Sequence, residues 1–343
     1  AVAAPLASRH LADLGARVIK IEREGEGDFA RAYDATVHGQ ASHFIWLNRG
    51  KESVELDLRS QRGRDIALAL ADRADVVISN LGPGAMERLG LGAAALRERK
   101  NDLVVVTITG YGETGPYRDR KAYDMLVQAE SGLCSVTGTP ETATKTGVPV
   151  SDIATAMYAL SSTQAALLRR AHTGLGATVE VSMFEATAEW MGHPMYIRMY
   201  DGRQVGRMGL SHASICPYDA FPTRDGQVMI GVQNDRGWAA LVGDVLERPD
   251  LVHDERYATN IARVARRAEV DSLIGALTSR FDSVELTDRL DRFGVPAARL
   301  NDVAALVDHP QLQARDRWRD VQTPAGPAQG LLPPMTFADV ELP

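Results

Sequence analysis

Cysteine is scarce in this sequence, and no histidine pair has a metal-binding spacing. The two cysteines, Cys134 and Cys216, lie far apart and form no CxxC motif. This excludes a disulfide framework and a thiolate metal site, and it is typical of a reducing compartment. The eight histidines include no HxxxH or HExxH pair. We therefore expect no metal centre.

Long apolar runs are also missing. No uninterrupted apolar segment is long enough to span a bilayer, so we expect no membrane partner. The sequence opens at Ala1 without an initiator methionine, which is compatible with a removed targeting segment. The cytoplasm is the default location.

Positive charge is in deficit. The 38 lysines and arginines face 45 acidic residues, giving a formal net charge of -7. A nucleic-acid-binding protein would need a basic face, so no nucleic-acid partner is expected. An anionic small molecule is compatible with this balance, because a few local arginines can reverse the potential inside a cleft. A chain of 343 residues favours one large domain plus a lesser one.

The first half of the chain alternates short β-branched runs with amphipathic stretches. Strands separated by helices of this length form βαβ units. The predicted fold is α/β, with an open, doubly wound parallel sheet (Rossmann-like) in the large domain. The predicted strands are Arg17–Glu22, Ser53–Leu58, Asp75–Ser79, Leu103–Thr109 and Ala177–Met183; the predicted helices are Gln61–Ala74, a stretch ending near Lys100, and Ile153–His172, which Gly174 and Gly176 terminate.

The periodic pattern ends near residue 190. Residues 191–214 mix glycine, arginine and methionine without periodicity and are the best candidate for a linker. A strand at Gln227–Val232 and helices near Trp238–Leu246, Ala268–Arg280 and Val284–Phe293 then indicate a smaller α/β domain. The predicted division is a large domain at 1–190, the linker at 191–214, a small domain at 215–305, and a segment at 306–343 that returns to the large domain. The proline-rich tail from Thr323 is predicted to be extended.

Two short motifs suggest chemistry that their surroundings oppose. Residues 25–30 (GEGDFA) match a dinucleotide-binding G-x-G-x-x-A pattern after a strand. Four acidic residues crowd this loop, where a pyrophosphate needs positive potential, so a plain turn is the better interpretation. Residues 209–213 (GLSHA) resemble a hydrolase nucleophile elbow but lack its closing glycine and a preceding strand, so we discount them.

Residues 148–155 (VPVSDIAT) end an extended run and start the long helix. The simplest interpretation is that Ser151 or Asp152 caps this helix. A carboxylate at a helix N-terminus also feels the positive end of the dipole and stays ionised at neutral pH. An ionised carboxylate in a dry cleft can attack a thioester. The capping and catalytic interpretations are compatible.

At this motif the chain resembles the class III CoA-transferases, the family of carnitine, formyl-CoA and bile-acid CoA-transferases. Six segments in the same order carry the resemblance, which runs from the first residues to about Phe337. They are Leu11–Glu22 (LADLGARVIKIE), Asn48–Leu58 (NRGKESVELDL), Ala74–Gly92 (ADVVISNLGPGAMERLGLG), Thr109–Asp124 (TGYGETGPYRDRKAYD), Pro149–Ala159 (PVSDIATAMYA) and Thr173–Ala186 (TGLGATVEVSMFEA).

The resemblance implies a role for individual residues. The nucleophilic aspartate of the family falls on Asp152, which makes 1–190 the CoA-binding domain. Arginine and lysine at the CoA positions suit the 3′-phosphate and pyrophosphate, leucines suit the adenine, and an asparagine can hydrogen-bond the ligand. The implied CoA positions are Arg23, Leu56, Asn80, Leu81, Arg88 and Lys121, with Val2 and Ala3 as remnants of a pocket that would start before Ala1. The family also commonly continues with a helix beyond Pro343.

Tyr123 separates the transferases from the racemases that share this fold. The α-methylacyl-CoA racemases place a histidine at this position as one of a pair of acid–base groups. A phenol with a pKa near ~10 is a poor proton shuttle at neutral pH compared with an imidazole near ~6.5. Tyr123 therefore favours CoA transfer, in which Tyr123 or backbone N–H groups near Asp152 could donate a hydrogen bond to the oxyanion. Racemisation of an acyl-CoA and non-catalytic acyl-CoA binding stay as alternatives.

The expected activity is transfer of CoA between carboxylic acids, with CoA as co-substrate and no permanently bound cofactor. The resemblance implies a homodimer of two interlocked chains. Residues 209–226 resemble relatives that act on four- and five-carbon dicarboxylates such as mesaconyl- or succinyl-CoA, and the absent glycine-rich lid argues against oxalate and formate. Two interpretations of the charges at Arg198, Arg203, Arg207 and His212 are open: they bind a second carboxylate, or they are linker charges.

Overall fold

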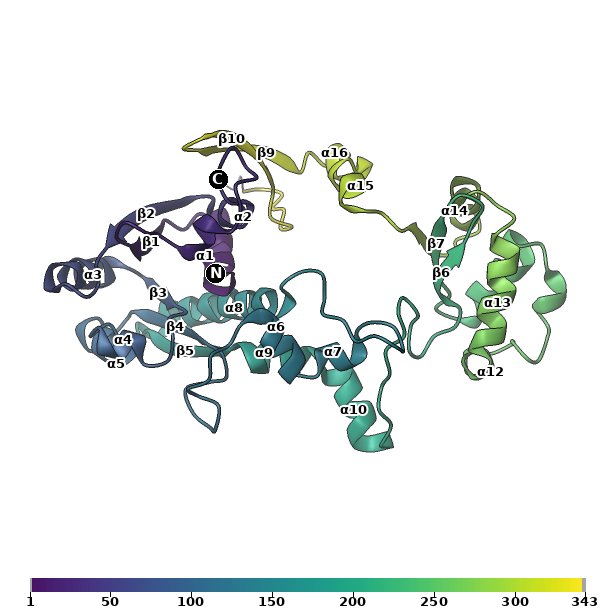
Figure 1. Cartoon of the computed structure of the whole chain (residues 1–343), viewed down its shortest axis with the longest axis horizontal. Helices are drawn as coiled ribbons and strands as arrows, with labels where there is room; N and C mark the ends of the chain where they lie inside the picture. The colour runs from purple at the N-terminus through teal and green to yellow at the C-terminus, as the bar shows by residue number, and fades with distance from the viewer. Residues whose placement is uncertain (1, 341–343) are drawn as a thin grey trace. The chain divides into compact units, whose positions relative to one another are not determined.

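The computed structural model describes residues 2–340 and consists of two compact units. The first unit contains the chain up to Ser135, the stretch Thr144–Gln204 and the chain from Asp316 onward. The second unit contains Val136–Ala143 and Val205–Arg315. Figure 1 shows the elements of both units along the chain. Each unit has its own core and is described by itself.

Parallel strands form the first unit, as the sequence predicts, and they begin and end within two residues of the predicted bounds. The α/β class is confirmed. Hydrogen bonding divides these strands between a two-stranded and a three-stranded sheet instead of the single open sheet expected. The first sheet pairs β1 (Val18–Arg23) with β2 (Lys51–Leu56), and the second has the order β3 (Val76–Ser79), β4 (Val104–Thr109), β5 (Ala177–Ser182).

Strand β4 lies at the centre of the core because both of its faces are covered. Val104, Val106 and Ile108 point to one face, where they pack with residues of α1 (Ala3–Asp13) and α8 (Val150–Thr173). Val105 points to the other face and packs with α3 (Gln61–Arg73) and α5 (Ala93–Arg99). A strand that is apolar on both sides is typical of a parallel sheet with a helical layer on each face.

Helix α8 is the long alanine-rich helix that the sequence predicts. It ends at Gly174, whose φ of 71° is the left-handed conformation of a helix C-terminus. Ala156, Ala159 and Ala166 are buried in the core that α8 shares with α1 and β4. Small side chains at these positions let the backbones approach closely, so α8 is firmly held along its length.

The remaining helices of the first unit lie in the segments between these strands and after β5. The region predicted as an irregular linker contains a helix, α10, so the absence of periodicity at 191–214 was misleading. None of the side chains of α10 is buried, and a helix that buries no face needs no apolar period. The other elements are η1 (Phe29–Ala32), α2 (Ser42–Asn48), α4 (Ala85–Arg88), α6 (Asp124–Glu130), α7 (Leu133–Val136), α9 (Met183–Trp190) and α10 (Gly192–Asp201).

The C-terminal tail is extended, as predicted, and forms a hairpin in the first unit. Strand β9 (Trp318–Thr323) pairs antiparallel with β10 (Gly326–Leu331). Gln40 Nε2 donates to Thr323 Oγ1 at 2.8 Å, and Arg49 Nη1 donates to the Leu331 carbonyl. These bonds tie the hairpin to the segment around α2.

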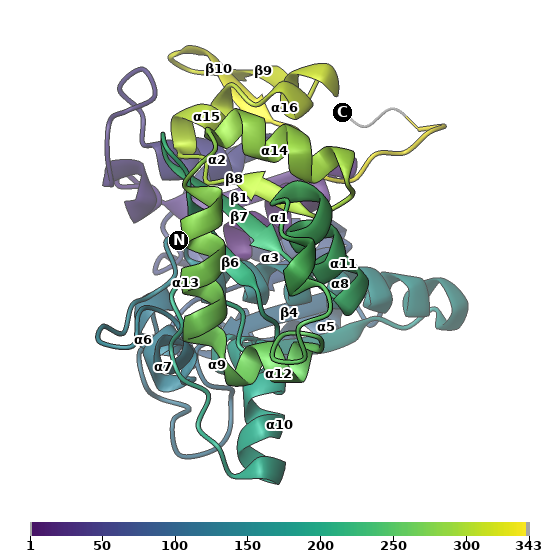
Figure 2. The same ribbon diagram turned by 90° about the vertical axis from the view of Figure 1, so that its right-hand side faces the viewer.

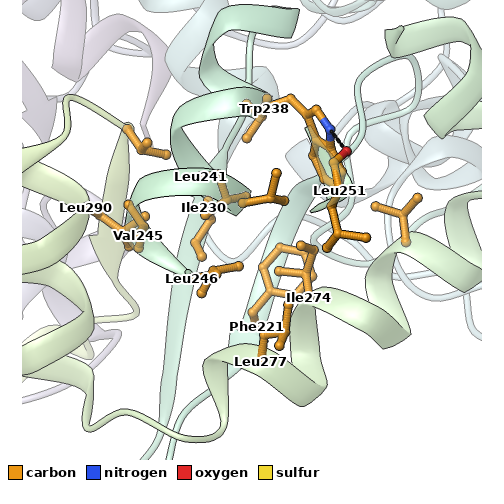
Figure 3. Close-up of a cluster of buried hydrophobic side chains, with 14 of the residues drawn as sticks. Phe221, Ile230, Trp238, Leu241, Val245, Leu246, Leu251, Ile274, Leu277 and Leu290 are labelled. Atoms are coloured by element: carbon orange, nitrogen blue, oxygen red, sulfur yellow. Dashed lines mark hydrogen bonds between the residues drawn. The ribbon is translucent and has the colours of Figure 1, made fainter. Parts of the chain in front are cut away.

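The second unit is a three-stranded antiparallel sheet, β6 (Tyr218–Pro222), β7 (Gln227–Gly231) and β8 (Ala297–Arg299), with helices packed on it. Helices α13 (Arg267–Thr278) and α14 (Ser283–Arg292) contact the sheet, as Figure 2 shows. Trp238 is buried in the core, and its Nε1 donates to the Leu251 carbonyl at 3.3 Å (Figure 3). The other elements are α11 (Asp235–Ala239), the π-helical η2 (Ala240–Val245), η3 (Pro249–Leu251), α12 (Asn260–Ala265), α15 (Val303–Val307) and α16 (Pro310–Ala314).

Between residues 2 and 340, none of the helices combines the length and the apolar character needed to cross a bilayer. The same residues bring no three of histidine, cysteine, aspartate and glutamate together in a way that would hold a metal ion.

Candidate active site

The first unit contains a large cleft of about 2200 Å³. Its lining includes eight of the ten residues that the sequence nominates for catalysis or CoA binding: Val2, Ala3, Arg23, Asn80, Leu81, Lys121, Tyr123 and Asp152. Leu56 and Arg88 do not line it. Leu56 packs against the core on the α3 face of the sheet, and Arg88 donates to the Pro83 carbonyl at 3.2 Å.

Asp152 lies in the first turn of α8, but it does not cap the helix, and neither does Ser151. The N-cap residue is Pro149, which supplies no side-chain hydrogen bond, and the buried Ser151 Oγ has no partner. The prediction of a local cap is therefore wrong. The cap comes from Asp124, 28 residues earlier, whose Oδ1 accepts the backbone N–H groups of Ser151 at 2.8 Å and Asp152 at 3.1 Å.

Asp124 is itself held by a buried amide. Its Oδ2 accepts from Gln128 Nε2 at 2.6 Å, and Gln128 is fully buried. Gln128 Oε1 in turn accepts the backbone N–H of Thr146 at 3.0 Å and its hydroxyl at 3.2 Å. The Asp124–Gln128 pair therefore fixes α6, the start of α8 and the loop between Thr144 and Pro149 relative to one another.

Burial dominates the electrostatics of the Asp152 carboxyl. It raises the pKa of Asp152 to about 6, the negative charge of Asp124 acts in the same direction, and a hydrogen bond from the Ala3 backbone N–H opposes them. The sequence-based expectation considered only the stabilising helix dipole. Desolvation outweighs that dipole, although a carboxyl group with this pKa is still mainly ionised at neutral pH.

Aromatic side chains line the same cleft as Asp152. Tyr123 precedes α6 and is 66 % exposed on the cleft wall. Burial raises the pKa of Tyr33, and the negative charges of Asp28 and Asp152 raise it further, which places Tyr33 within electrostatic reach of Asp152. Tyr33 also packs edge-on against His43, with ring centroids 5.6 Å apart. Sequence reasoning missed Tyr33 and His43, because their segment has no pattern that points to a site.

The CoA-binding candidates gather at the carboxyl ends of parallel strands. Arg23 and Leu56 are the last residues of β1 and β2 and face each other in register, and Asn80 and Leu81 follow β3 directly. Ligands of open α/β sheets bind at this edge. Arg23 is paired with Glu26 at 2.7 Å, and both side chains are exposed.

The loop after β1 is a turn, as predicted, and hydrogen bonds to its acidic side chains hold it in place. A short 3₁₀ segment follows it instead of the long helix of a dinucleotide site. The buried Glu22 accepts from Arg31 Nη2 at 2.7 Å and from Ser53 Oγ at 2.7 Å. Burial alone would raise the pKa of Glu22, but these bonds and the Asp28 backbone N–H lower it to about 2.

The four charges proposed for a second carboxylate are engaged elsewhere. Arg198 donates to the Gly202 carbonyl and Arg203 pairs with Asp201. In the second unit, Arg207 donates to the carbonyls of Thr139 and Pro140, both at 2.8 Å, and the His212 ring stacks on Tyr218. None of the four lines the cleft that holds Asp152 within the described residues. These contacts favour the interpretation as linker charges.

Comparison with known proteins places this arrangement in a family. Residues 1–342 match the family described as CoA-transferase family III, and the chain belongs to that family. It is 35 % identical to a succinate–glutarate CoA-transferase of Agrobacterium fabrum over 95 % of this chain and 83 % of that protein. It is also 35 % identical to an acetyl-CoA:oxalate CoA-transferase of Acetobacter aceti, over 91 % of this chain and 80 % of that protein.

A solved structure agrees with the sequence comparison. The crystal structure of a CAIB/BAIF family protein from Brucella suis superposes with a TM-score of 0.87 at 35 % identity, covering 100 % of this chain and 90 % of that one. The oxalate-named relative shows that overall similarity does not separate oxalate from longer dicarboxylates.

The capping role of Asp124 predicts a stability difference between two substitutions. Asp124→Ala leaves two amides of α8 and the amide of Gln128 without their acceptor, and should lower the free energy of unfolding by about 2–4 kcal/mol. Asp124→Asn keeps an acceptor oxygen and should lose less. Urea unfolding followed by helical circular dichroism measures both. Asp119→Ala, a substitution of an exposed acid on the same cleft, should change stability by less than about 0.5 kcal/mol. Equal losses for Asp124→Ala and Asp119→Ala would contradict the cap.

The raised pKa of Asp152 predicts that its charge weakens the fold. Between pH ~4 and ~6 the folded protein keeps a proton that the unfolded chain has lost, so stability decreases as pH rises through this interval. Asp152→Asn removes that penalty. The variant should exceed the wild type in unfolding free energy by on the order of 2 kcal/mol at neutral pH, with the gap closing below pH ~4. A gap that does not change with pH would show that Asp152 is not desolvated.

Proposed function

We propose that this protein transfers CoA from an acyl-CoA donor to a carboxylic acid acceptor, with Asp152 as the covalent nucleophile. The observation that supports it is the desolvated carboxylate at the start of α8, in the same cleft as Arg23, Asn80 and Lys121, in a member of CoA-transferase family III. Succinate, glutarate and oxalate, for which these two relatives are named, are dicarboxylates, and we infer a dicarboxylate for this chain as well.

The transfer proceeds by four acyl exchanges. Asp152 Oδ attacks the thioester carbonyl of the donor, the C–S bond breaks, and a mixed anhydride and CoA thiolate form. The thiolate attacks the aspartyl carbonyl, which releases the donor acid as carboxylate and leaves an aspartyl-CoA thioester. The acceptor carboxylate then attacks this thioester, again giving an anhydride and thiolate. Attack of the thiolate on the acceptor acyl carbon regenerates Asp152 and releases the new acyl-CoA. Charge and protons balance without ATP.

Each exchange develops negative charge on a carbonyl oxygen that needs a hydrogen-bond donor. We expected either Tyr123 or backbone N–H groups near Asp152 to be this donor, but these backbone N–H groups already have acceptors. The N–H groups of Ser151 and Asp152 are taken by Asp124, and that of Ile153 donates to the Pro149 carbonyl at 3.0 Å. The Tyr123 hydroxyl on the cleft wall is the donor that we propose for this role.

The CoA moiety would lie along the carboxyl edge of β1–β3. Arg23 and Lys121 supply charge for its phosphates, Asn80 and Leu81 contact the adenine side, and Val2 and Ala3 border the thiol end near Asp152. Leu56 and Arg88 stay proposed CoA contacts, and either would need a local rearrangement to face the cleft.

We also propose that two chains form the interlocked homodimer of the family, with residues 1–190 as the CoA-binding domain, and that the protein acts in the cytoplasm. Exposed apolar side chains on α6 and α10 support the dimer. They include Met125 and Leu126 on α6 and Tyr196, Met199 and Tyr200 on α10, and such a surface is typical of a protein interface.

Covalent trapping tests the role of Asp152. Wild-type protein given succinyl-CoA should form an adduct at Asp152 that borohydride or hydroxylamine traps for mass spectrometry. Asp152→Ala should bind CoA, form no adduct and lose at least about ten-thousandfold in transfer rate. Asp119→Ala is the matched control and should transfer normally. Retained transfer by Asp152→Ala would rule the mechanism out, and uptake of solvent deuterium at the α-carbon without an acceptor would indicate a racemase.

The rate of donor consumption should follow the ionisation of Asp152. Because only the carboxylate attacks, kcat/KM for succinyl-CoA should rise with pH, with an apparent pKa near 6, and level off above it. Asp124→Asn removes a neighbouring negative charge and should move this inflection to lower pH. An inflection that stays in place or moves to higher pH in Asp124→Asn would contradict the electrostatic coupling of the two carboxylates.

A further inference from the structure

Lys145 is a cation in the cleft without a carboxylate partner. Its side chain lines the cleft that holds Asp152, and its Nζ donates to the Thr146 carbonyl at 3.0 Å. Among residues 2–340, no acidic oxygen lies within ion-pair distance of it. A lysine amine has three donors, so this single bond leaves capacity for an anionic ligand.

Most other cations of the cleft are engaged. Lys51 is engaged as well, although by neutral acceptors and not by an acid. Its Nζ donates to the Pro5 carbonyl at 2.7 Å and to Asn48 Oδ1 at 3.0 Å. The ion-paired ones are Arg17 with Glu52, Lys20 with Asp28, Arg23 with Glu26, Arg118 with Asp119, Arg120 with Glu130 and Arg170 with Asp75. Arg73, Lys121 and Lys145 are left.

Arg73, Lys121 and Lys145 differ in where they lie along the cleft. Arg73 ends α3 and immediately precedes β3, at the end of the sheet where Arg170 of α8 binds Asp75 Oδ1 at 2.9 Å. Eighteen residues of helix separate Arg170 from Asp152, which places this end roughly 27 Å from the nucleophile. Lys121 is our candidate for the CoA phosphates. Only Lys145 is then left for the part of the cleft that would hold the acyl group of the substrate.

The loop of Lys145 is fixed to the nucleophile by the network described above. Thr146, the next residue, is bound by both its N–H and its hydroxyl to Gln128, Gln128 binds Asp124, and Asp124 binds the amide of Asp152. The loop that carries Lys145 is therefore connected to the start of α8, and so to Asp152, through these hydrogen bonds. That is the arrangement needed to recognise an acyl group that carries a charge at its far end.

We propose that Lys145 binds the distal carboxylate of a dicarboxylic substrate while its proximal carboxyl group reacts at Asp152. The proposal rests on the CoA-transfer function proposed above and assigns the residue that would select dicarboxylates over monocarboxylates of equal length. Lys145 is exposed, and a hydrogen bond between its ammonium group and a substrate carboxylate gives a selectivity of roughly ten- to a hundredfold.

Acceptor competition tests the proposal. Succinyl-CoA is the common donor, and glutarate and pentanoate are paired five-carbon acceptors, read by mass spectrometry as glutaryl-CoA and pentanoyl-CoA. Because the donor is shared, its own binding cancels in the ratio of the two kcat/KM values. Lys145→Met should lower this glutarate-to-pentanoate ratio roughly ten- to a hundredfold, and Lys145→Arg should restore most of it.

Lys121→Met is the matched control, a lysine of the same cleft that we assign to the CoA phosphates. It should raise KM for the CoA thioester and leave the acceptor ratio unchanged. If Lys145→Met lowers kcat/KM for glutarate and for pentanoate to the same extent, the proposed role of Lys145 is wrong and the transferase function still stands. A wild-type protein that transfers CoA to neither acid would overturn both.

Discussion

The hydrogen bonds from the first amides of α8 to the Asp124 carboxylate are the interaction on which the site depends. A helix start in the protein interior must find acceptors for its free N–H groups. Here the acceptor belongs to another helix, because Pro149 cannot cap and the Ser151 hydroxyl makes no hydrogen bond. One carboxylate thus joins α6 to α8, and the position of Asp152 follows from the folding of both helices.

This solution places two carboxylates at one helix N-terminus, and their charges oppose each other. The oxygens of Asp124 accept two backbone N–H groups and the side-chain amide of Gln128. Asp152 has fewer hydrogen bonds. Burial and the negative charge of Asp124 both disfavour its ionised form, so its pKa rises to about 6. For a nucleophile this is a useful compromise. A carboxylate of higher pKa is more nucleophilic, yet about nine-tenths of the molecules are still ionised at neutral pH.

The sequence allows the strands, the long helix and the class of fold to be predicted because these depend on local periodicity. The spacing of apolar residues locates β1–β5 and α8 within a few residues. The spacing of apolar residues cannot show contacts between residues far apart in the chain. Asp124 lies in one of the segments that resemble the family, but nothing in Lys121–Asp124 shows that its side chain caps a helix 27 residues later. The pKa of Asp152 likewise depends on burial by α1 and on a neighbour from α6. Helix α10 escapes prediction for the opposite reason, since it buries nothing and leaves no period.

Ion pairs in the cleft differ in how readily a ligand can open them. The side chains of Arg23 and Glu26 are 62 % and 72 % exposed, and such a surface pair contributes at most about 1 kcal/mol. A CoA phosphate that binds Arg23, as we propose, would therefore lose little by displacing Glu26. Lys20 and Asp28 are only 16 % and 12 % exposed, and separating them would leave a buried charge without a partner. The exposed pair is thus suited to exchange with a ligand, and the buried pair is suited to hold the turn after β1. Under the proposed function, this difference lets a cleft rich in carboxylates accept a strongly anionic substrate.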